Sequence, residues 1–310
     1  MVLHPKLQAM LAKAAQLPAL SSLTPAQIRA GDLARYAKVP IVDVAHVEDR
    51  WIAGPRGDIR IRIYRPDSAF GHPIVTFFHG SGFVICSIDT HDGLCRQLCK
   101  RAHAVVVSVD YRLAPEHKFP AGPDDALAAT RWVHANAVEI GGDPGRLIVA
   151  GDSAGATMAL VTAIRLRDAG SANASAIVSG QILMYPVTNY PDPAPLSYAE
   201  RGSGYGLSAA DMHYFWGHYL NTPDDGTHPD ASPLRTERLA GLPRTYIMTA
   251  EYDPLRDEGE QLAARLVAEG GNVVLSHYGD MNHGFMSWVG WLDRADEALD
   301  AACIWIADRS

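Results

Sequence analysis

The sequence predicts an α/β fold in which helices flank both faces of a mostly parallel central sheet. Short apolar runs have the length and composition of buried parallel strands, and they lie at residues 74–78, 104–109, 147–150, 177–184, 245–249 and 272–277. Helical segments alternate with most of these runs, near residues 90–101, 124–137, 154–168, 256–269 and 293–307. The chain has 310 residues, which is enough to bury the core of one large domain of this kind.

The N-terminal part of the chain does not follow this alternation of strands and helices. Lysines interrupt its apolar residues, which predicts an amphipathic helix near residues 6–15 rather than a signal peptide. A second helix is expected over residues 25–36, because Thr24 can cap it with a proline in its first turn. Residues 58–64 then alternate between apolar and polar types, which indicates a half-buried strand.

A long segment over residues 188–238 interrupts the strand–helix alternation. It is rich in proline, glycine and aromatic residues, with one expected helix near residues 209–219. An insertion after a central strand lies over the carboxyl ends of the strands, where α/β sheets bind ligands. We therefore expect residues 1–40 and 188–238 to form a helical cap over the α/β catalytic domain, whose two parts are residues 41–187 and 239–310.

The composition of the chain disfavours several classes of protein. The net charge of −8 disfavours a nucleic-acid partner, and no apolar stretch approaches the 18 or more residues of a membrane span. A cytoplasmic protein is expected. The cysteines are expected to be free thiols in a reducing compartment, and no Cys-x-x-Cys pair exists, so the sequence predicts no zinc site; they are Cys86, Cys95, Cys99 and Cys303.

The motif GDSAG at residues 151–155 predicts a nucleophile. It follows the apolar run 147–150 and opens the helical run 154–168, the strand–turn–helix context of a nucleophile elbow. Glycines flank such a serine because the backbone turns sharply there. We therefore predict an α/β-hydrolase with Ser153 as its nucleophile and Asp152 supporting the motif.

A serine hydroxyl needs a base, and in this fold an acid and then a histidine follow the serine in the chain. His283 lies in a turn-rich loop after the last apolar run and is the expected base. His277 lies within that run and is expected to be structural.

The acid is expected at the end of the run 245–249. Asp253 lies in the turn there, although an aspartate just before a helix can also be a simple cap. Two rival carboxylates are nearby. We expect Asp257 to be a first-turn helix acid and Glu251 a supporting residue.

The motif HGSGF at residues 79–83 has the position of an HGGG-type oxyanion loop after its strand, with serine in place of the middle glycine. Such a loop places backbone N–H groups where the negative oxygen of the reaction intermediate develops. Its His79 and Gly80 are expected to support the loop.

Together these motifs make the chain resemble the hormone-sensitive lipase family of esterases over nearly its whole length. Further matching segments are DYRLAPE at 110–116, FPAGPDD at 119–125, YDPLRD at 252–257 and HGF at 283–285.

The resemblance implies a carboxylesterase that acts on short-to-medium acyl esters through an acyl-enzyme intermediate. It assigns Ser153 as nucleophile, His283 as general base and acid, and Asp253 as the group that orients the histidine. It places the oxyanion donors at the backbone N–H groups of Ser81, Gly82 and Ala154. It also implies that the reaction needs no cofactor and no metal.

Ser81 is where the loop departs from the family pattern. Serine adopts positive φ less readily than glycine. We expect Ser81 to keep its N–H in the hole while its side chain points away or bonds locally. A Ser81→Gly variant with unchanged or better kcat would support this.

Two other functions remain open on the sequence alone. An amidase or formamidase would use the same triad, and parallel assays on p-nitrophenyl butyrate and an aryl formamide would separate them. A ligand-binding protein on an inactive hydrolase scaffold is disfavoured because Ser153, Asp253 and His283 are all present. The expected partner is a small-molecule ester, a homodimer is possible, and the candidate pocket residues are Phe83, Tyr185, Tyr205, Phe215 and Phe285.

Overall fold

The computed structural model describes residues 2–169 and 177–308. Its centre is an eight-stranded sheet with the order β1-β2-β4-β3-β5-β6-β7-β8. Strands β1 and β2 form an antiparallel hairpin, β2 pairs antiparallel with β4, and the remaining pairs are parallel. The strands are β1 (His46–Gly54), β2 (Gly57–Arg65), β3 (His72–Phe78), β4 (Val105–Asp110), β5 (Gly142–Asp152), β6 (Gly180–Met184), β7 (Arg244–Tyr252) and β8 (Val273–Asn282). The predicted α/β fold is confirmed.

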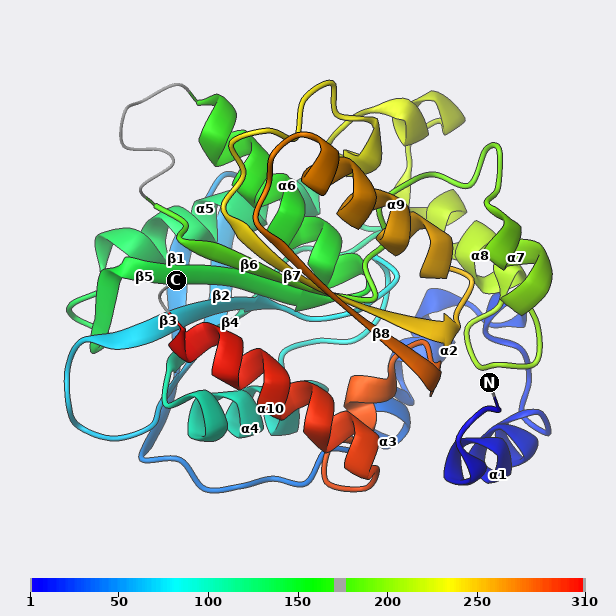
Figure 1. Cartoon of the computed structure of the whole chain (residues 1–310), viewed down its shortest axis with the longest axis horizontal. Helices are drawn as coiled ribbons and strands as arrows, with labels where there is room; N and C mark the ends of the chain where they lie inside the picture. The colour runs from blue at the N-terminus through cyan, green and yellow to red at the C-terminus, as the bar shows by residue number, and fades with distance from the viewer. Residues whose placement is uncertain (1, 170–176, 309–310) are drawn as a thin grey trace.

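Helices cover both faces of the sheet (Figure 1). One face carries α4 (Asp92–Ala102) and α10 (Asp293–Ala307). The other carries α5 (Ala121–Ala135), α6 (Ala154–Asp168) and α9 (Arg256–Ala268). Two separate apolar cores result, one on each face. Every residue of β3 is buried as a consequence, which is why the parallel strands appear in the sequence as unbroken apolar runs.

Strand β1 was not predicted, because consecutive polar residues, Glu48, Asp49 and Arg50, interrupt its apolar ones. Only Ile52 of its nine residues is buried, since β1 lies at the edge of the sheet. The helix expected over residues 25–36 is divided into α2 (Pro25–Arg29) and α3 (Asp32–Tyr36). Glycine has low helix propensity, and Gly31 precedes α3. The Asp32 carboxylate accepts a hydrogen bond from the Cys86 N–H at 2.7 Å, which fixes α3 against the α/β domain.

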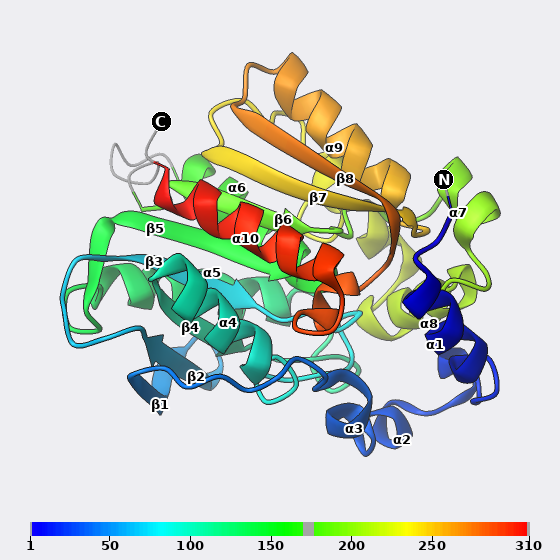
Figure 2. The same cartoon turned by 60° about the horizontal axis from the view of Figure 1, so that its bottom comes forward.

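The N-terminal helices and the segment after β6 lie side by side at the carboxyl ends of the parallel strands (Figures 1 and 2). The elements involved are α1 (Pro5–Ala14), α2, α3, α7 (Leu196–Arg201) and α8 (Ala209–Tyr219). The Ser21 N–H donates to Asp211 at 3.1 Å, and the Tyr214 hydroxyl donates to the Leu23 carbonyl at 2.8 Å. The two segments are thus joined by hydrogen bonds although almost 200 residues separate them in the chain.

Across residues 2–169 and 177–308, no helix is both long enough and apolar enough to cross a bilayer. All four cysteines are free and buried.

Candidate active site

Ser153 occupies the sharp turn between β5 and α6. Its φ of 54° lies in the left-handed region that non-glycine residues rarely adopt, a conformation that costs about 1–3 kcal/mol and is often found at functional sites. The turn is fixed by the Ser153 N–H, which donates to the Met184 carbonyl at 2.9 Å. The strand–turn–helix geometry expected of a nucleophile elbow is present.

The glycine after the elbow has no room for a side chain. A β-carbon on Gly155 would overlap the backbone oxygen of Phe78. We therefore expect Gly155→Ala to lower the free energy of unfolding by about 3–5 kcal/mol or to prevent folding. Urea denaturation measures the change.

Gly217→Ala is the matched control, because a β-carbon there meets open space on α8. It should be neutral or stabilise the protein by up to about 1 kcal/mol, since alanine favours a helix more than glycine does. Equal stability of the two variants would show that the elbow is not tightly packed.

His283 links the serine to a buried carboxylate. Its Nε2 lies 2.9 Å from Ser153 Oγ, and its Nδ1 lies 2.7 Å from Asp253 Oδ2. Asp253 follows the end of β7 and His283 follows the end of β8, so adjacent parallel strands deliver both groups to the same edge of the sheet. The Asp253 side chain has no exposed surface, and its Oδ1 accepts the Leu255 N–H at 2.8 Å. A base that contacts a nucleophile and is oriented by an acid can activate the hydroxyl.

The rival histidine and carboxylates occupy other positions. His277 lies within β8, where its Nδ1 contacts the Thr249 hydroxyl at 3.1 Å. Glu251 forms ion pairs with arginines from α7 and α9. Burial opposes ionisation of Glu251, but these arginines hold its pKa below the usual value. Asp257 accepts the Ser197 N–H at 2.8 Å and so joins α9 to α7.

The loop after β3 brings two further backbone groups to the serine. Across residues 2–169 and 177–308, no protein group accepts a hydrogen bond from the N–H of Ser81, Gly82 or Ala154. Buried N–H groups without an acceptor are rare in folded proteins, so these three are available to a ligand. Gly82 and Phe83 both have positive φ in this loop, 52° and 67°, and a β-carbon on Gly82 would approach the Phe215 ring to 2.5 Å.

The Ser81 side chain bonds within the loop. Its Oγ lies 2.7 Å from the Tyr111 hydroxyl and accepts the Phe83 N–H at 2.8 Å. The Tyr111 hydroxyl in turn donates to the His79 carbonyl at 2.7 Å, so the Ser81 hydroxyl donates to Tyr111. Ser81 is not among the residues with positive φ, so serine causes no backbone strain at this position.

A buried polar group holds this loop against the elbow. Asp152 accepts the Gly80 N–H at 2.6 Å and lies 3.3 Å from His91 Nε2. Burial alone would raise the pKa of Asp152, but His91 and the Gly80 N–H keep it below its usual value. His79 stacks on Tyr111, and burial lowers its pKa to about 3, so its ring is neutral. His91 is a contributor that the sequence did not reveal, because only the fold brings it to the elbow.

The protein-family model described as alpha/beta hydrolase fold matches residues 75–287. The chain belongs to the α/β-hydrolase family. Esterase LipI of Mycobacterium tuberculosis is 42% identical over 269 residues, which cover 86% of this chain and 82% of the relative. An ethyl acetate hydrolase of Pseudomonas putida is 36% identical over 242 residues, 77% of this chain and 75% of the relative. Among solved structures, a hyperthermophilic esterase from the archaeon Pyrobaculum calidifontis has a TM-score of 0.90 at 40% identity and covers 99% of this chain and 98% of its own.

A cavity of about 630 Å³ opens beside Ser153 in this α/β-hydrolase. Its floor contains the catalytic-site candidates Ser153 and His283 and the loop 80–82. Its walls are mostly aliphatic and come from the N-terminal segment and from residues 206–215; they include Leu7, Met10, Leu11, Leu17, Leu20, Leu207, Met212 and Phe215.

Of the five aromatic pocket candidates, Phe215 lines the cavity. Phe83 instead stacks on Tyr219 with ring centroids 4.0 Å apart, and Tyr185 packs edge-on against His283 at 4.9 Å. These two rings pack against neighbouring side chains, and the cavity wall is mostly aliphatic. The candidates that the structure places outside the cavity lining are Phe83, Tyr185, Tyr205 and Phe285.

Glu258 is a further buried group that the sequence did not single out. It accepts the N–H groups of Thr188 and Asn189 at 2.6 and 2.8 Å. Burial raises the pKa of its carboxyl to about 8, and the charge of nearby Asp253 acts in the same direction. Glu258 therefore anchors the start of the segment 188–238 close to the candidate acid of the hydrolase.

Proposed function

We propose that the chain hydrolyses short-to-medium acyl esters through an acyl-enzyme intermediate on Ser153. The chain is a carboxylic ester hydrolase, and the proposal adds the residues and the substrate range. One observation carries it: an unbroken hydrogen-bonded chain runs from buried Asp253 through His283 to Ser153 at the floor of the cavity.

The proposed reaction has two steps. In the first, His283 Nε2 takes the proton of the Ser153 hydroxyl as its oxygen attacks the ester carbonyl. The alcohol leaves with that proton, which His283 donates. In the second step a water molecule gives one proton to His283 and attacks the acyl-enzyme. The acyl–Ser153 bond then breaks, His283 returns the proton to the Ser153 oxygen, and the carboxylic acid is released. Asp253 holds the imidazole in orientation and stabilises its positive charge.

Three backbone N–H groups are proposed to stabilise the negative oxygen in both steps. They belong to Ser81, Gly82 and Ala154, and their lack of other acceptors within the described residues supports this role. Removing one such donor typically costs about 3–4 kcal/mol of transition-state stabilisation.

We also propose membership of the hormone-sensitive lipase type, with residues 1–40 and 188–238 as the cap. The hydrogen bonds between these segments and their place in the cavity wall support the cap. A cytoplasmic location and a homodimer stay predictions.

Hydrolysis rates across p-nitrophenyl esters from acetate to palmitate test the substrate range. The cavity volume and aliphatic wall favour acyl chains of intermediate length, so the rate should peak before the longest esters. An aryl formamide is assayed in parallel. A higher kcat/KM for the formamide than for p-nitrophenyl butyrate would contradict the proposed ester preference.

The Ser81 hydroxyl is expected to position the loop without taking part in the chemistry. Ser81→Ala removes its bonds to Tyr111 and to the Phe83 N–H, each worth about 0.5–1.5 kcal/mol. We therefore expect kcat to fall by less than about tenfold. Tyr111→Phe, which removes the same hydroxyl contact from the other side, is the matched variant. A hundredfold loss in Ser81→Ala alone would assign the hydroxyl a role in the reaction.

A further inference from the structure

A second cluster of polar side chains lies at the amino ends of the parallel strands, on the opposite side of the sheet from Ser153. Asp67 follows β2, His72 is the first residue of β3, and His103 ends α4 just before β4. Strands β3 and β4 are adjacent and parallel, so their amino ends bring the three residues together. Ser153, in contrast, follows the carboxyl end of β5.

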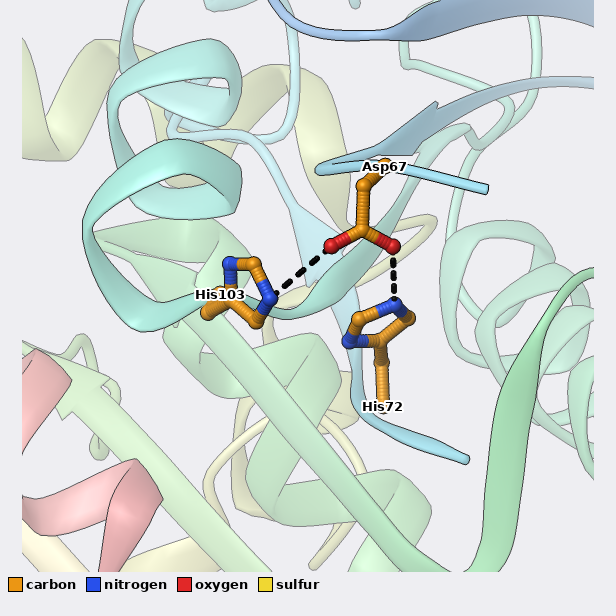
Figure 3. Close-up of side chains that lie close together, drawn as sticks. All are labelled: Asp67, His72 and His103. Carbon is orange, nitrogen blue, oxygen red and sulfur yellow. Dashed lines mark hydrogen bonds and ion pairs between the residues drawn. The ribbon is translucent and has the colours of Figure 1, made fainter. Parts of the chain in front are cut away.

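Both imidazole rings point at the Asp67 carboxylate (Figure 3). His72 Nε2 lies 2.9 Å from one carboxylate oxygen, and His103 Nε2 lies 3.0 Å from the other. One nitrogen from each histidine and one oxygen of Asp67 all lie within 4.8 Å of one another. A tetrahedral Zn²⁺ with bonds of about 2.0–2.1 Å holds its ligand atoms about 3.4 Å apart, so small side-chain rotations would suffice to seat an ion.

Two of the three ligand groups are held in place before any ion binds. The His72 side chain is only 7% exposed, and the Asp67 carboxylate accepts the Ala69 N–H at 2.7 Å. His103 is 64% exposed, which leaves one side of the cluster open to water. A bound ion could therefore keep a water molecule as its remaining ligand.

The local backbone also favours a cation at this place. His103 lies at the carboxyl end of α4, where the helix dipole places partial negative charge. Its φ of 50° is left-handed, at a position where helices most often have glycine. A histidine here carries a conformational cost that its side-chain contacts must offset.

We propose that Asp67, His72 and His103 bind a divalent transition-metal ion of the Zn²⁺ class. Two imidazole nitrogens and one carboxylate oxygen suit Zn²⁺, Co²⁺ or Ni²⁺, whereas Mg²⁺ and Ca²⁺ prefer ligand sets made of oxygen. The ion replaces the protons that the two Nε2 atoms share with Asp67, so each bound imidazole keeps its proton on Nδ1. The ion ties the segment after β2 to the end of α4 and is structural, because the site lies far along the sheet from Ser153.

No cysteine takes part in this site, so the lack of a Cys-x-x-Cys pair in the sequence is consistent with it. The alternative is a plain His–Asp–His ion-pair cluster without a metal. Partly exposed ion pairs of that kind contribute little to stability. The two possibilities differ in their response to added metal.

The test uses untagged full-length protein stripped with EDTA and titrated with ZnCl₂ by calorimetry, with MgCl₂ as the comparison. We expect one Zn²⁺ per chain, a Tm that rises by a few degrees at saturating Zn²⁺, and no rise with Mg²⁺. The kcat of the EDTA-treated enzyme should be unchanged. Failure of the metal proposal can therefore be distinguished from failure of the proposed ester hydrolysis. Absence of a Zn²⁺-dependent Tm shift up to about 100 µM would overturn the proposal.

His103→Gly gives the sharpest variant. Glycine relieves the left-handed conformation, so the Tm without metal should be equal or higher, while Zn²⁺ affinity falls at least tenfold. Asp67→Asn should weaken binding similarly and still accept the Ala69 N–H. His213→Ala, which removes an exposed histidine on α8, is the matched control and should bind Zn²⁺ as the parent does. Parent-like affinity in His103→Gly would place the bound ion elsewhere and refute the assignment.

Discussion

Ser153→Ala is expected to lower kcat for p-nitrophenyl butyrate by about 10⁵–10⁶-fold while the protein stays folded. Alanine keeps the N–H that bonds to the Met184 carbonyl, so the elbow survives, but it leaves His283 with no hydroxyl to deprotonate. The rate is measured after titration of active sites with a fluorophosphonate, so that traces of parent enzyme are counted. A variant that retains a tenth of the activity would exclude Ser153 as the nucleophile.

Ser179→Ala serves as the matched control for the loss of a serine hydroxyl. Ser179 lies just before β6, at the amino end of the sheet, and its hydroxyl donates to the Leu147 carbonyl. We expect parent-like kcat and a loss of stability of about 1 kcal/mol.

Asp253→Asn is expected to lower kcat by about 10⁴-fold, because the asparagine would stabilise the inactive tautomer of His283. The Leu255 N–H donates to Asp253 Oδ1, so the asparagine oxygen should remain there and its NH₂ group should face His283. Nδ1 must then accept a hydrogen bond, which places the proton on Nε2, where it blocks transfer from Ser153. The kcat and its pH profile are measured together.

Asp257→Asn tests the rival acid in the same assay. Asp257 joins α9 to α7 through the Ser197 N–H, so a change in stability is expected with kcat within a few fold of the parent. If Asp257→Asn lost as much activity as Asp253→Asn, the assignment of the acid would be wrong.

The sequence predicted the parallel strands and the candidate site because each depends on local patterns. Ser153 lies between a strand and a helix whose apolar residues are continuous, and Asp253 and His283 each follow an expected strand. Their contacts follow because β5, β7 and β8 are parallel and end on the same side of the sheet. The edge strand β1 escaped prediction because its polar residues face water.

Contacts between distant segments could not be predicted in the same way. Phe83 and Phe215 are both apolar aromatics, yet Phe83 stacks on Tyr219 of α8 whereas Phe215 lines the cavity. His91 reaches Asp152, and His103 reaches Asp67, only through the pairing and order of the strands. No spacing in the sequence predicts these contacts.

The way the cavity beside Ser153 is built affects how substrate selectivity can evolve. The candidate catalytic groups follow the ends of β5, β7 and β8, whereas most of the aliphatic wall comes from residues 7–38 and 206–215. Mutations that reshape the wall therefore fall in parts of the gene separate from those that encode the reaction. Selectivity for a new acyl chain can drift by substitutions at positions such as Leu11 or Met212 while the chemistry is inherited intact.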